Sequence, residues 1–391
     1  MISKRSFIGG IGASLSIPLA PWTLAEASRS TGRRLILVEL SGANDGLNTL
    51  VPFGHDRYYN LRPNIALDRS DLILINDWQG LHGSLSPLLP CWQDGDLAVV
   101  QGLGYPGQSR SHFKSIALWE SGGDGNRAGR TGWLTDDVLS LNQSDLDVHG
   151  ISLDGGMGVF AASDGTWISL TSLSQLTELS SSNRTFEFNG TASDNSALGE
   201  LLSRANSLDT AMSNISAKLA QAKPTVNANI GGGDLGRQMG LALHLIAHNI
   251  ETPVLKVQIS GFDTHEYQNG RHSRKLRDLG QALAGLRRGL KSLAQWDQTL
   301  VMTYSEFGRR AEENNSQGTD HGTAAPHFVM GGRVRGGLWG QHPDLDNLQD
   351  GDIQYTMDYR SLYERVLSDW FGLQTNRFLS ARESALSGLL I

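Results

Sequence analysis

The sequence contains very little cysteine: Cys91 is the only one among 391 residues. A single cysteine excludes an internal disulfide and any zinc site built from several thiolates. Cys91 lies between Pro90 and Trp92 in a predicted amphipathic helix. We therefore interpret it as a buried core thiol rather than a nucleophile.

The sequence also lacks a strong charge of either sign, an internal repeat and a clear linker. Its 33 basic and 40 acidic residues give a formal charge of −7. That balance argues against a general nucleic-acid binder, which needs a basic surface. Hydrophobic content of 39% is typical of a soluble globular protein. The length permits one large α/β domain or two smaller ones. Without a linker we predict a single domain over residues 28–391.

Long apolar runs are missing, and the one notable apolar stretch lies at the N-terminus. Lys4 and Arg5 precede a run rich in Gly, Ala and Ser up to about Ala20, and Ala25-Glu26-Ala27 offers a small-residue cleavage site. This pattern predicts an export signal over residues 1–27. It is similar to a twin-arginine signal with Lys in place of the first Arg, and the ordinary secretory route stays open. The run is shorter than the ~20 residues of a membrane anchor. We expect a periplasmic or extracellular bacterial protein without a membrane span in its mature form.

Short apolar runs that alternate with amphipathic helices predict an α/β fold. The main strands are expected at residues 34–40, 97–101, 254–260, 300–304 and 327–330. Helices of crossover length lie between them, so we expect a mostly parallel sheet with helices on both faces. Two helices that end near Leu219 and Asn249 predict a helical hairpin, inserted near residues 195–249 and packed on the sheet.

Side chains that can bind metal follow three of the predicted strands. In chain order they are Asp45, Asp263, His265, Glu306, Asp320 and His321. Because ligands gather at the carboxyl ends of strands in an open α/β sheet, we expect these groups to share one pocket. Imidazole and carboxylate suit zinc, manganese or magnesium. Asp45, Asp263, His265, Asp320 and His321 are five potential ligands, which is enough for two ions. Glu306 is an alternative ligand at one of these positions. Two ions together stabilise the attacking and leaving oxygens of a displacement.

A loop between predicted strand 97–101 and the next helix carries Ser109, Arg110, Ser111 and His112. Backbone N–H groups at a helix N-terminus bind anions, and Arg110 is suited to hold an anionic oxygen with two hydrogen bonds. We expect this loop to supply an anion site and a nucleophile. Two alternatives stay open: Ser111 is a helix N-cap, and His112 is a helix-start residue packed against Phe113.

Five motifs in this order resemble the bacterial exported DUF1501 proteins over nearly the whole mature chain. They are Asn44-Asp45-Gly46-Leu47-Asn48-Thr49, Ser109-Arg110-Ser111-His112-Phe113, Asp263-Thr264-His265, Glu306-Phe307-Gly308-Arg309 and Gly318-Thr319-Asp320-His321-Gly322. That family is grouped with the alkaline phosphatase and sulfatase superfamily, whose members bind divalent metals and hydrolyse phosphate or sulfate esters. The resemblance implies an alkaline phosphatase-like fold and a site for zinc or manganese ions.

The resemblance also implies roles for single residues. The positions that match the superfamily's metal ligands are Asp45, Asp263, His265, Asp320 and His321. His327 stands for the final histidine of that set or is a buried structural histidine. In this chain Glu306 occupies the place directly after the strand, where the superfamily's Asp-His pair usually lies.

The nucleophile is the main departure from the superfamily pattern. The stretch Pro106-Gly107-Gln108-Ser109-Arg110 has no Cys or Ser at its head, which argues against formylglycine sulfatase chemistry. In order of preference, the candidate nucleophiles are Ser111, Ser109 and Thr49, because a metal lowers the pKa of a hydroxyl and activates it. We expect a metal-dependent hydrolase of phosphate or sulfate esters. The alternatives are a non-catalytic cell-envelope binding protein with this fold and a plain secreted structural protein.

Overall fold

The computed structural model describes residues 32–125, 128–141, 146–162, 164–175, 197–221, 226–227, 230–374, 377–378, 381 and 384–391. The predicted export signal, residues 1–27, lies outside this part of the chain. Within it, no helix is long and apolar enough to cross a membrane.

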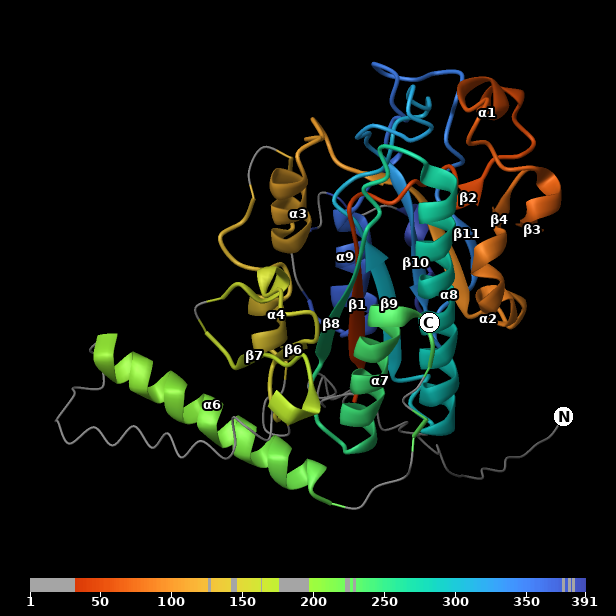
Figure 1. The fold of residues 1–391 in the computed structure, drawn as a ribbon. Coiled ribbons are helices and arrows are strands. Elements are labelled where there is room, and N and C mark those ends of the chain that lie inside the picture. The colour runs from red at the N-terminus through yellow and green to blue at the C-terminus, as the bar shows by residue number, and fades with distance from the viewer. Residues whose placement is uncertain are drawn as a thin grey trace, which may run out of the picture.

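A nine-stranded sheet forms the centre of the described structure (Figure 1). β1 (Arg34–Ser41) lies in its middle and pairs in parallel with β8 (Val254–Ser260) and β9 (Thr299–Tyr304). Beyond β8 follow β6 (Gly150–Ser152) and β7 (Trp167–Ser169), both parallel. The sheet is therefore mostly parallel, as the sequence predicted.

The other side of the sheet contains its one antiparallel member. β10 (Ala325–Met330) runs antiparallel to β9 and to β5 (Leu97–Gly104). Two short strands, β11 (Gly337–Trp339) and β12 (Met357–Asp358), pair in parallel with β5. Because β10 follows β9 without a crossover helix, it returns in the opposite direction.

Helices cover both faces of the sheet, as predicted, because residues of β1 alternate between two cores. Ile36 and Val38 pack in one core with leucines of α7 (Gly233–Ala247) and α8 (Gln268–Ser292). Leu35 and Leu37 belong to the opposite core. Its helices are α3 (His112–Ser121), α4 (Thr135–Leu139) and α9 (Arg360–Arg365), with a π-helical turn at Val366–Trp370. Full burial of alternate residues on two faces is typical of a central strand.

Smaller elements complete the fold. A three-stranded antiparallel sheet lies beside the main one and contains β2 (Leu50–Val51), β3 (Leu72–Leu74) and β4 (Gly80–His82). The remaining short helices are α1 (Asp56–Leu61), α2 (Leu89–Gln93) and the 3-10 turns Arg69–Asp71, Gly83–Leu88, Gly158–Phe160 and Ser384–Leu386. Cys91 in α2 is buried, and burial raises the pKa of its thiol to about 11. An inert core thiol is the expected result.

The two helices of the predicted hairpin contact different neighbours. α7 packs against α8 and β8. In contrast, α6 (Ala197–Leu219) extends away from the body of the molecule in Figure 1. Its C-terminal part is held by buried Ile215 and by an ion pair of 2.6 Å between Lys218 and Asp147. The hairpin over residues 195–249 stays a prediction.

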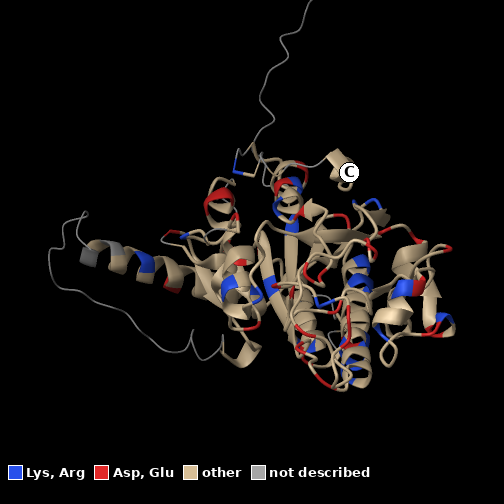
Figure 2. Ribbon diagram, turned by 90° about the horizontal axis from the view of Figure 1, so that it is seen from above, with Lys and Arg blue, Asp and Glu red and all other residues tan. Residues whose placement is uncertain are grey.

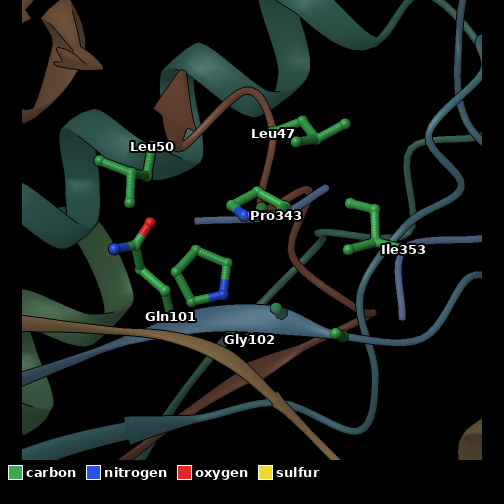
Figure 3. A pocket seen from close by; sticks show the side chains of 10 residues that line it. Leu47, Leu50, Gln101, Gly102, Pro343 and Ile353 are labelled. Atoms are coloured by element: carbon green, nitrogen blue, oxygen red, sulfur yellow. The ribbon is translucent and has the colours of Figure 1, made fainter. Parts of the chain in front are cut away.

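The loop after β1 borders a small apolar pocket, shown in Figure 3. Leu47 of this loop and Leu50 of β2 face Gln101, Pro343 and Ile353 across it. None of the residues that line the pocket carries a charge, so it offers no group for acid–base or metal chemistry. Viewed from above in Figure 2, acidic and basic residues are interspersed over the described part of the chain.

Candidate metal centre

Three loops meet at the carboxyl ends of β1, β8 and β9, and glycine permits their close approach. Gly42 after β1 has a φ of 109°, and a Cβ at this position would overlap the backbone of Phe262 and Asp263 after β8. A Cβ on Gly318 would likewise overlap the backbone of His265. The first contact joins segments 221 residues apart in the sequence (42 and 263), and the second joins segments 53 residues apart (265 and 318).

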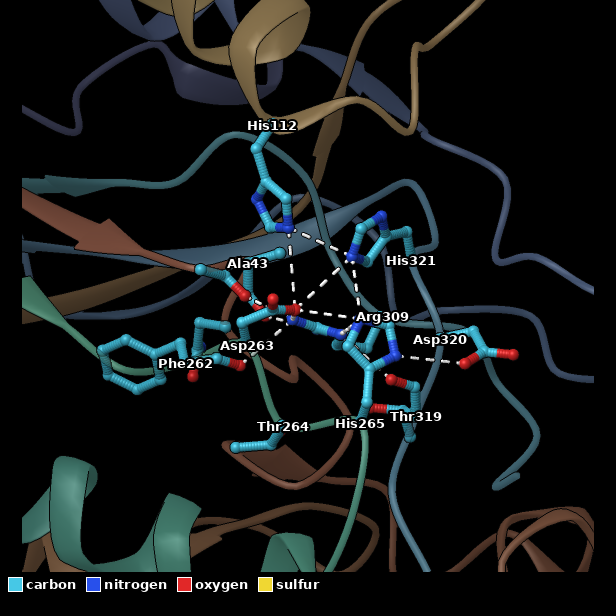
Figure 4. A network of polar contacts seen from close by, with 12 residues as sticks. Ala43, His112, Phe262, Asp263, Thr264, His265, Arg309, Thr319, Asp320 and His321 are labelled. Atoms are coloured by element: carbon cyan, nitrogen blue, oxygen red, sulfur yellow. Dashed lines mark hydrogen bonds and ion pairs between the residues drawn. The ribbon is translucent and has the colours of Figure 1, made fainter. Parts of the chain in front are cut away.

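The loops place one carboxylate oxygen among three imidazole nitrogens (Figure 4). Nε2 of His321 lies 3.0 Å from Nε2 of His112, 3.0 Å from Nε2 of His265 and 3.4 Å from Oδ1 of Asp263. The same Oδ1 lies 3.0 Å from Nε2 of His265 and 3.6 Å from Nε2 of His112. Ligand atoms of a tetrahedral zinc site, each about 2.0–2.1 Å from the ion, lie about 3.3–3.4 Å from one another. The separations among His112, Asp263 and His321 are close to these values, and their ligand atoms all lie within 4.8 Å of one another. Nε2 of His265 lies 3.0 Å from Asp263 Oδ1 and from His321 Nε2 but does not belong to that group.

The second ring nitrogen, Nδ1, of each of the three histidines lies within hydrogen-bond distance of an acceptor oxygen. Nδ1 of His112 lies 2.8 Å from Oε1 of Glu306, and Nδ1 of His265 lies 3.2 Å from Oδ1 of Asp320. Nδ1 of His321 lies 2.8 Å from the backbone oxygen of Arg110. In a neutral ring each Nδ1 then carries the proton and donates it to that oxygen, as metal-ligating histidines do.

This tautomer leaves a lone pair on each Nε2. The Nε2 atoms of His112 and His265 each lie 3.0 Å from Nε2 of His321, and Nη1 of Arg309 lies 3.5 Å from Nε2 of His265. Two lone pairs at 3.0 Å repel each other, and a cation between them converts that repulsion into attraction. Two imidazoles and one carboxylate, with the imidazole of His265 beside them, form a donor set that suits zinc. Within the described residues, His112, Asp263 and His321 form the one group of three or more His, Cys, Asp or Glu whose ligand atoms all lie within 4.8 Å of one another.

The ionisation of the acidic groups matches these roles. Burial opposes ionisation of Glu306, but its hydrogen bonds to His112, to the Gly42 backbone and to Ser305 outweigh burial and lower its pKa. Asp263 is similar: partial burial raises its pKa, and Arg309 more than compensates. The hydrogen bond to Glu306 raises the pKa of His112. The carboxylates are therefore charged at neutral pH and favour positive charge in the cluster.

Arg309 donates hydrogen bonds to all three of the loops that follow β1, β8 and β9. Its side chain is fully buried and donates to the backbone oxygens of Gly42, Ala43, Phe262 and Thr319. It also donates to Oδ1 of Asp263. Because these bonds use its donors inside the protein, Arg309 positions Asp263 and is not exposed to a substrate. The sequence presented this arginine only as part of a motif.

The structure separates Asp45 from the cluster. Its side chain is fully buried and forms an ion pair of 2.6 Å with Arg62, the residue that directly follows α1. Gln268 and the Leu47 backbone N–H also donate to it. Burial raises the pKa of Asp45, but Arg62 outweighs burial and lowers it. These contacts place Asp45 in a buried ion pair instead of among the candidate ligands.

Glu306 and Asp320 are not among the candidate ligands but contact the histidines of the cluster. Each carboxylate accepts from the Nδ1 of a histidine whose Nε2 faces the centre. Glu306 is buried and also accepts from the backbone N–H groups of Gly42 and Ala43, at 2.9 and 3.1 Å. The structure therefore brings together Asp263, His265 and His321 of the predicted ligands, with Glu306 and Asp320 as supports of the histidine rings.

His327 lies in β10 and packs edge-on against Trp119, with 5.2 Å between ring centroids. It is 1% exposed, and its Nδ1 has no hydrogen-bond partner among the described residues. Burial lowers its pKa to about 3. This is the environment of a buried structural histidine, one of the two alternatives that the sequence left open.

We expect His327 to make folding stability depend on pH. Its folded-state pKa lies below the unfolded value of about 6.5, so its contribution is fully present above pH ~6.5 and is lost as pH falls toward 3. The loss is about 1.4 kcal/mol per pH unit. In urea unfolding at pH 6, 5 and 4, His327→Leu is expected to show a shallower decrease than the unsubstituted protein by about that slope. An unchanged slope would contradict this.

The Ser109–Ser111 loop lies beside the cluster, but the side chains of Ser109 and Arg110 contact other partners. Arg110 forms an ion pair with Asp352. Ser109 Oγ accepts from the Ser111 backbone N–H at 3.2 Å. Ser111 occupies the N-cap position of α3, yet its side chain makes no capping hydrogen bond. Thr49, the third candidate nucleophile, is buried and bonds to Asn44 and to the Asp45 backbone.

His112 is the candidate ligand that sequence reasoning missed. It is the first residue of α3, and the expected contact with Phe113 does not describe its environment, since Phe113 is 88% exposed. The ring of His112 instead packs near Phe307, with 4.9 Å between centroids. The signal available in the sequence was its place in the Ser109–Phe113 motif.

The chain matches one family model, described as "Protein of unknown function (DUF1501)", over residues 99–380. The chain belongs to the DUF1501 family. The match begins within β5 and includes all four residues of the cluster, together with Glu306 and Asp320. No curated protein matches this DUF1501 chain.

Several solved structures are similar to this DUF1501 chain in fold. Ps i-CgsB in complex with k-i-k-neocarrahexaose is 10% identical, with a TM-score of 0.42, and the match covers 90% of this chain and 75% of that one. The C-terminal periplasmic domain of EcEptC from Escherichia coli is 9% identical, with a TM-score of 0.40, covering 90% and 86%.

A third similar structure is a protein in the alkaline phosphatase superfamily from Vibrio parahaemolyticus. It is 9% identical, with a TM-score of 0.34, covering 80% of this chain and 62% of that one. With TM-scores below 0.5, these three likenesses support no statement about the superfamily or the activity of the DUF1501 protein.

Proposed function

We propose that this protein is an exported, metal-dependent hydrolase of phosphate or sulfate esters. The observation that carries the proposal is the convergence of three imidazole Nε2 atoms on Asp263 Oδ1, with every Nδ1 held by an oxygen acceptor. Pre-oriented rings of one tautomer are costly to maintain without a cation and are the usual surroundings of a metal.

His112, Asp263 and His321 would hold the ion, with His265 beside them as a further donor, and zinc fits this donor set best. A divalent ion bound there supplies Lewis-acid activation of the ester and of the attacking group. The described residues offer one such group, so we propose one ion. Glu306 and Asp320 keep the proton on Nδ1 of their histidines, and Arg309 holds the carboxylate of Asp263 in place.

The N-terminus of α3 favours an anionic ester at this position. His112 is the first residue of this ten-residue helix, so unpaired backbone N–H groups and the positive end of the helix dipole lie beside the cluster. Ser111 directly precedes His112, and its hydroxyl makes no capping bond. We propose Ser111 as the nucleophile: its oxygen bonds to phosphorus or sulfur as the alcohol leaves, and water then releases phosphate or sulfate.

A non-catalytic binding protein is the second candidate. One observation favours it: Arg110, the expected anion clamp, is paired with Asp352 instead of facing the cluster. Such a protein would keep the metal and bind an anion without turnover.

The test is hydrolysis by the zinc-loaded mature protein of three probes: p-nitrophenyl phosphate, bis(p-nitrophenyl) phosphate and p-nitrophenyl sulfate. We expect turnover of at least one probe, and its loss on chelation. His265→Ala is expected to retain less than about 1% of the activity. Removal of a group that only hydrogen-bonds to a metal ligand already lowers metal affinity or activity 10–100-fold. His244→Ala, a histidine of α7 outside the cluster, is the matched control.

The outcomes separate the two candidates. Metal binding without turnover of any probe would contradict the hydrolase and leave the binding protein. Activity that persists in Ser111→Ala would assign the attack to water instead of Ser111. Activity that persists in His265→Ala or after chelation would contradict the metal-dependent mechanism.

A further inference from the structure

The helix that follows the metal-centre loop contains a concentration of positive charge. α8 begins three residues after His265 and contains seven Lys or Arg residues but only one acidic residue, Asp278. The chain as a whole has the opposite balance, with a formal charge of −7. On a solvated helix face, acidic residues usually alternate with basic ones. α8 does not supply the acids that would neutralise its own cations.

Four of these cations share one side of α8, and all four are exposed to solvent. They are Arg274, Arg277, Arg288 and Lys291. Spacings of 3, 11 and 3 residues place them on one side of a helix with 3.6 residues per turn. We call this set the basic stripe. It extends over about 25 Å, because each residue adds about 1.5 Å to the length of a helix. Leu276, Leu283 and Leu290 of α8 face the core instead.

Few acids neutralise the basic stripe. Nζ of Lys291 lies 3.5 Å from Oδ2 of Asp96 and 3.6 Å from Oδ2 of Asp94. Within the described part of the chain, no carboxylate oxygen lies within 4.0 Å of a guanidinium nitrogen of Arg274, Arg277 or Arg288. Arginines at positions 274 and 277 are three residues apart, and like charges at this spacing destabilise a helix. An anion that lies across the arginines removes that repulsion.

A further lysine of α8 connects the basic stripe with the metal centre. The side chain of Lys275 lies against Gly261, since a Cβ at Gly261 would be 2.7 Å from Cε and 3.2 Å from Nζ of this lysine. Gly261 directly follows β8 and precedes Asp263 by two residues. The positive charge of α8 therefore continues from the stripe to the loop that carries Asp263 and His265.

We propose that the basic stripe binds a polymer that carries several phosphate or sulfate groups. The proposal rests on the proposed function in one respect: the ester group at the metal centre belongs to this polymer, while its neighbouring anionic groups pair with α8. A guanidinium group forms two parallel hydrogen bonds with an oxyanion, which suits arginine to this role. A stripe of about 25 Å exceeds the length of a single small ester and matches a chain.

An anionic membrane fits this surface less well than a polymer does. Helices that bind a membrane surface usually insert apolar side chains between the lipids, next to their cations. Every residue of α8 is described, and none of its large hydrophobic side chains is exposed. A surface that offers charge without apolar groups favours a polyanion in solution.

The experiment is isothermal titration calorimetry of the full mature, zinc-loaded chain. The ligands are dextran sulfate, uncharged dextran, glucose 6-sulfate and phosphatidylglycerol vesicles. We expect dextran sulfate to bind much more tightly than the other three, with an affinity that falls steeply as salt is added. Arg277→Gln/Arg288→Gln is expected to weaken this binding roughly tenfold, because two charge-assisted contacts are lost. Arg57→Gln/Arg237→Gln removes the same charge from exposed arginines of α1 and α7 and is the matched control.

The same titration of Asp263→Ala separates this proposal from the proposed function. Dextran sulfate binding that persists in Asp263→Ala and weakens in Arg277→Gln/Arg288→Gln supports the basic stripe, even if no ester is hydrolysed. The proposal is overturned if dextran sulfate does not bind, if glucose 6-sulfate or the vesicles bind as tightly, or if the stripe variant binds as tightly as the control. Hydrolysis of the nitrophenyl probes by a protein that fails this test would leave the proposed function standing.

Discussion

Replacing His112 by alanine is expected to lower the affinity for zinc by more than about 100-fold. The reason is that His112 provides one of the three donor atoms that all lie within 4.8 Å of one another. Loss of an outer hydrogen-bond partner of a ligand alone lowers metal affinity 10–100-fold. Its Nε2 lies 3.0 Å from that of His321 and 3.6 Å from Asp263 Oδ1. Without His112, Asp263 and His321 remain in this group, with His265 beside them, and one side of the ion is left open.

Comparison of two substitutions, Glu306→Gln and His112→Ala, tests this prediction. Glu306→Gln keeps the shape of the side chain but removes the charge that orients His112. Glu306→Gln is expected to lower the affinity for zinc 10–100-fold, which is a smaller loss than that expected for His112→Ala. Zinc content per folded chain and competition with a chelator measure both. Circular dichroism checks that each variant is folded. An affinity of His112→Ala equal to that of the unsubstituted protein would exclude His112 from the metal centre.

Asp45→Ala is expected to destabilise the protein by about 3–5 kcal/mol, because it leaves the buried charge of Arg62 without its partner. Both side chains are fully buried, and two hydrogen bonds join them, at 2.6 and 3.0 Å. Arg62 also donates to the backbone oxygens of Ala311 and Arg310, so it remains held in the interior after the substitution. Urea unfolding of the metal-free protein measures the free energy directly.

A double substitution and the metal content complete this test. Asp45→Ala/Arg62→Ala is expected to cost less than the sum of the two single substitutions, because their charges interact. The folded fraction of Asp45→Ala should bind zinc with nearly unchanged affinity. If Asp45→Ala instead folds with full stability and loses its zinc, Asp45 belongs to the metal site and the ion pair is secondary.

The fold was predictable because it depends on patterns that are local in the chain. Apolar runs of strand length and amphipathic helices between them predict β1, β5, β8 and β9, and their alternation predicts a mostly parallel sheet. The direction of β10 was not predictable in this way. It depends on whether the chain crosses the sheet between residues 304 and 325, and the polar loop there contains no helix in the structure.

The candidate site was predictable in its place and in part of its members. Asp263, His265 and His321 follow strands, and the carboxyl ends of parallel strands meet at one edge of the sheet. The sequence could not assign the carboxylates. Asp45, Asp263 and Asp320 each follow a strand or a glycine-bounded loop, yet one pairs with Arg62, one faces the centre and one supports His265.

The sequence by itself therefore determined the layers of the fold, the family and the edge of the sheet at which chemistry is possible. Only the tertiary structure decided which atoms share a centre. That choice depends on separations of about 3 Å between loops more than 150 residues apart, such as His112 and Asp263 or His112 and Glu306. Such separations follow from how Gly42 and Gly318 let the loops touch and from how Arg309 holds them. No pattern along the chain contains that information, because each contact joins segments that are independent until the sheet is assembled.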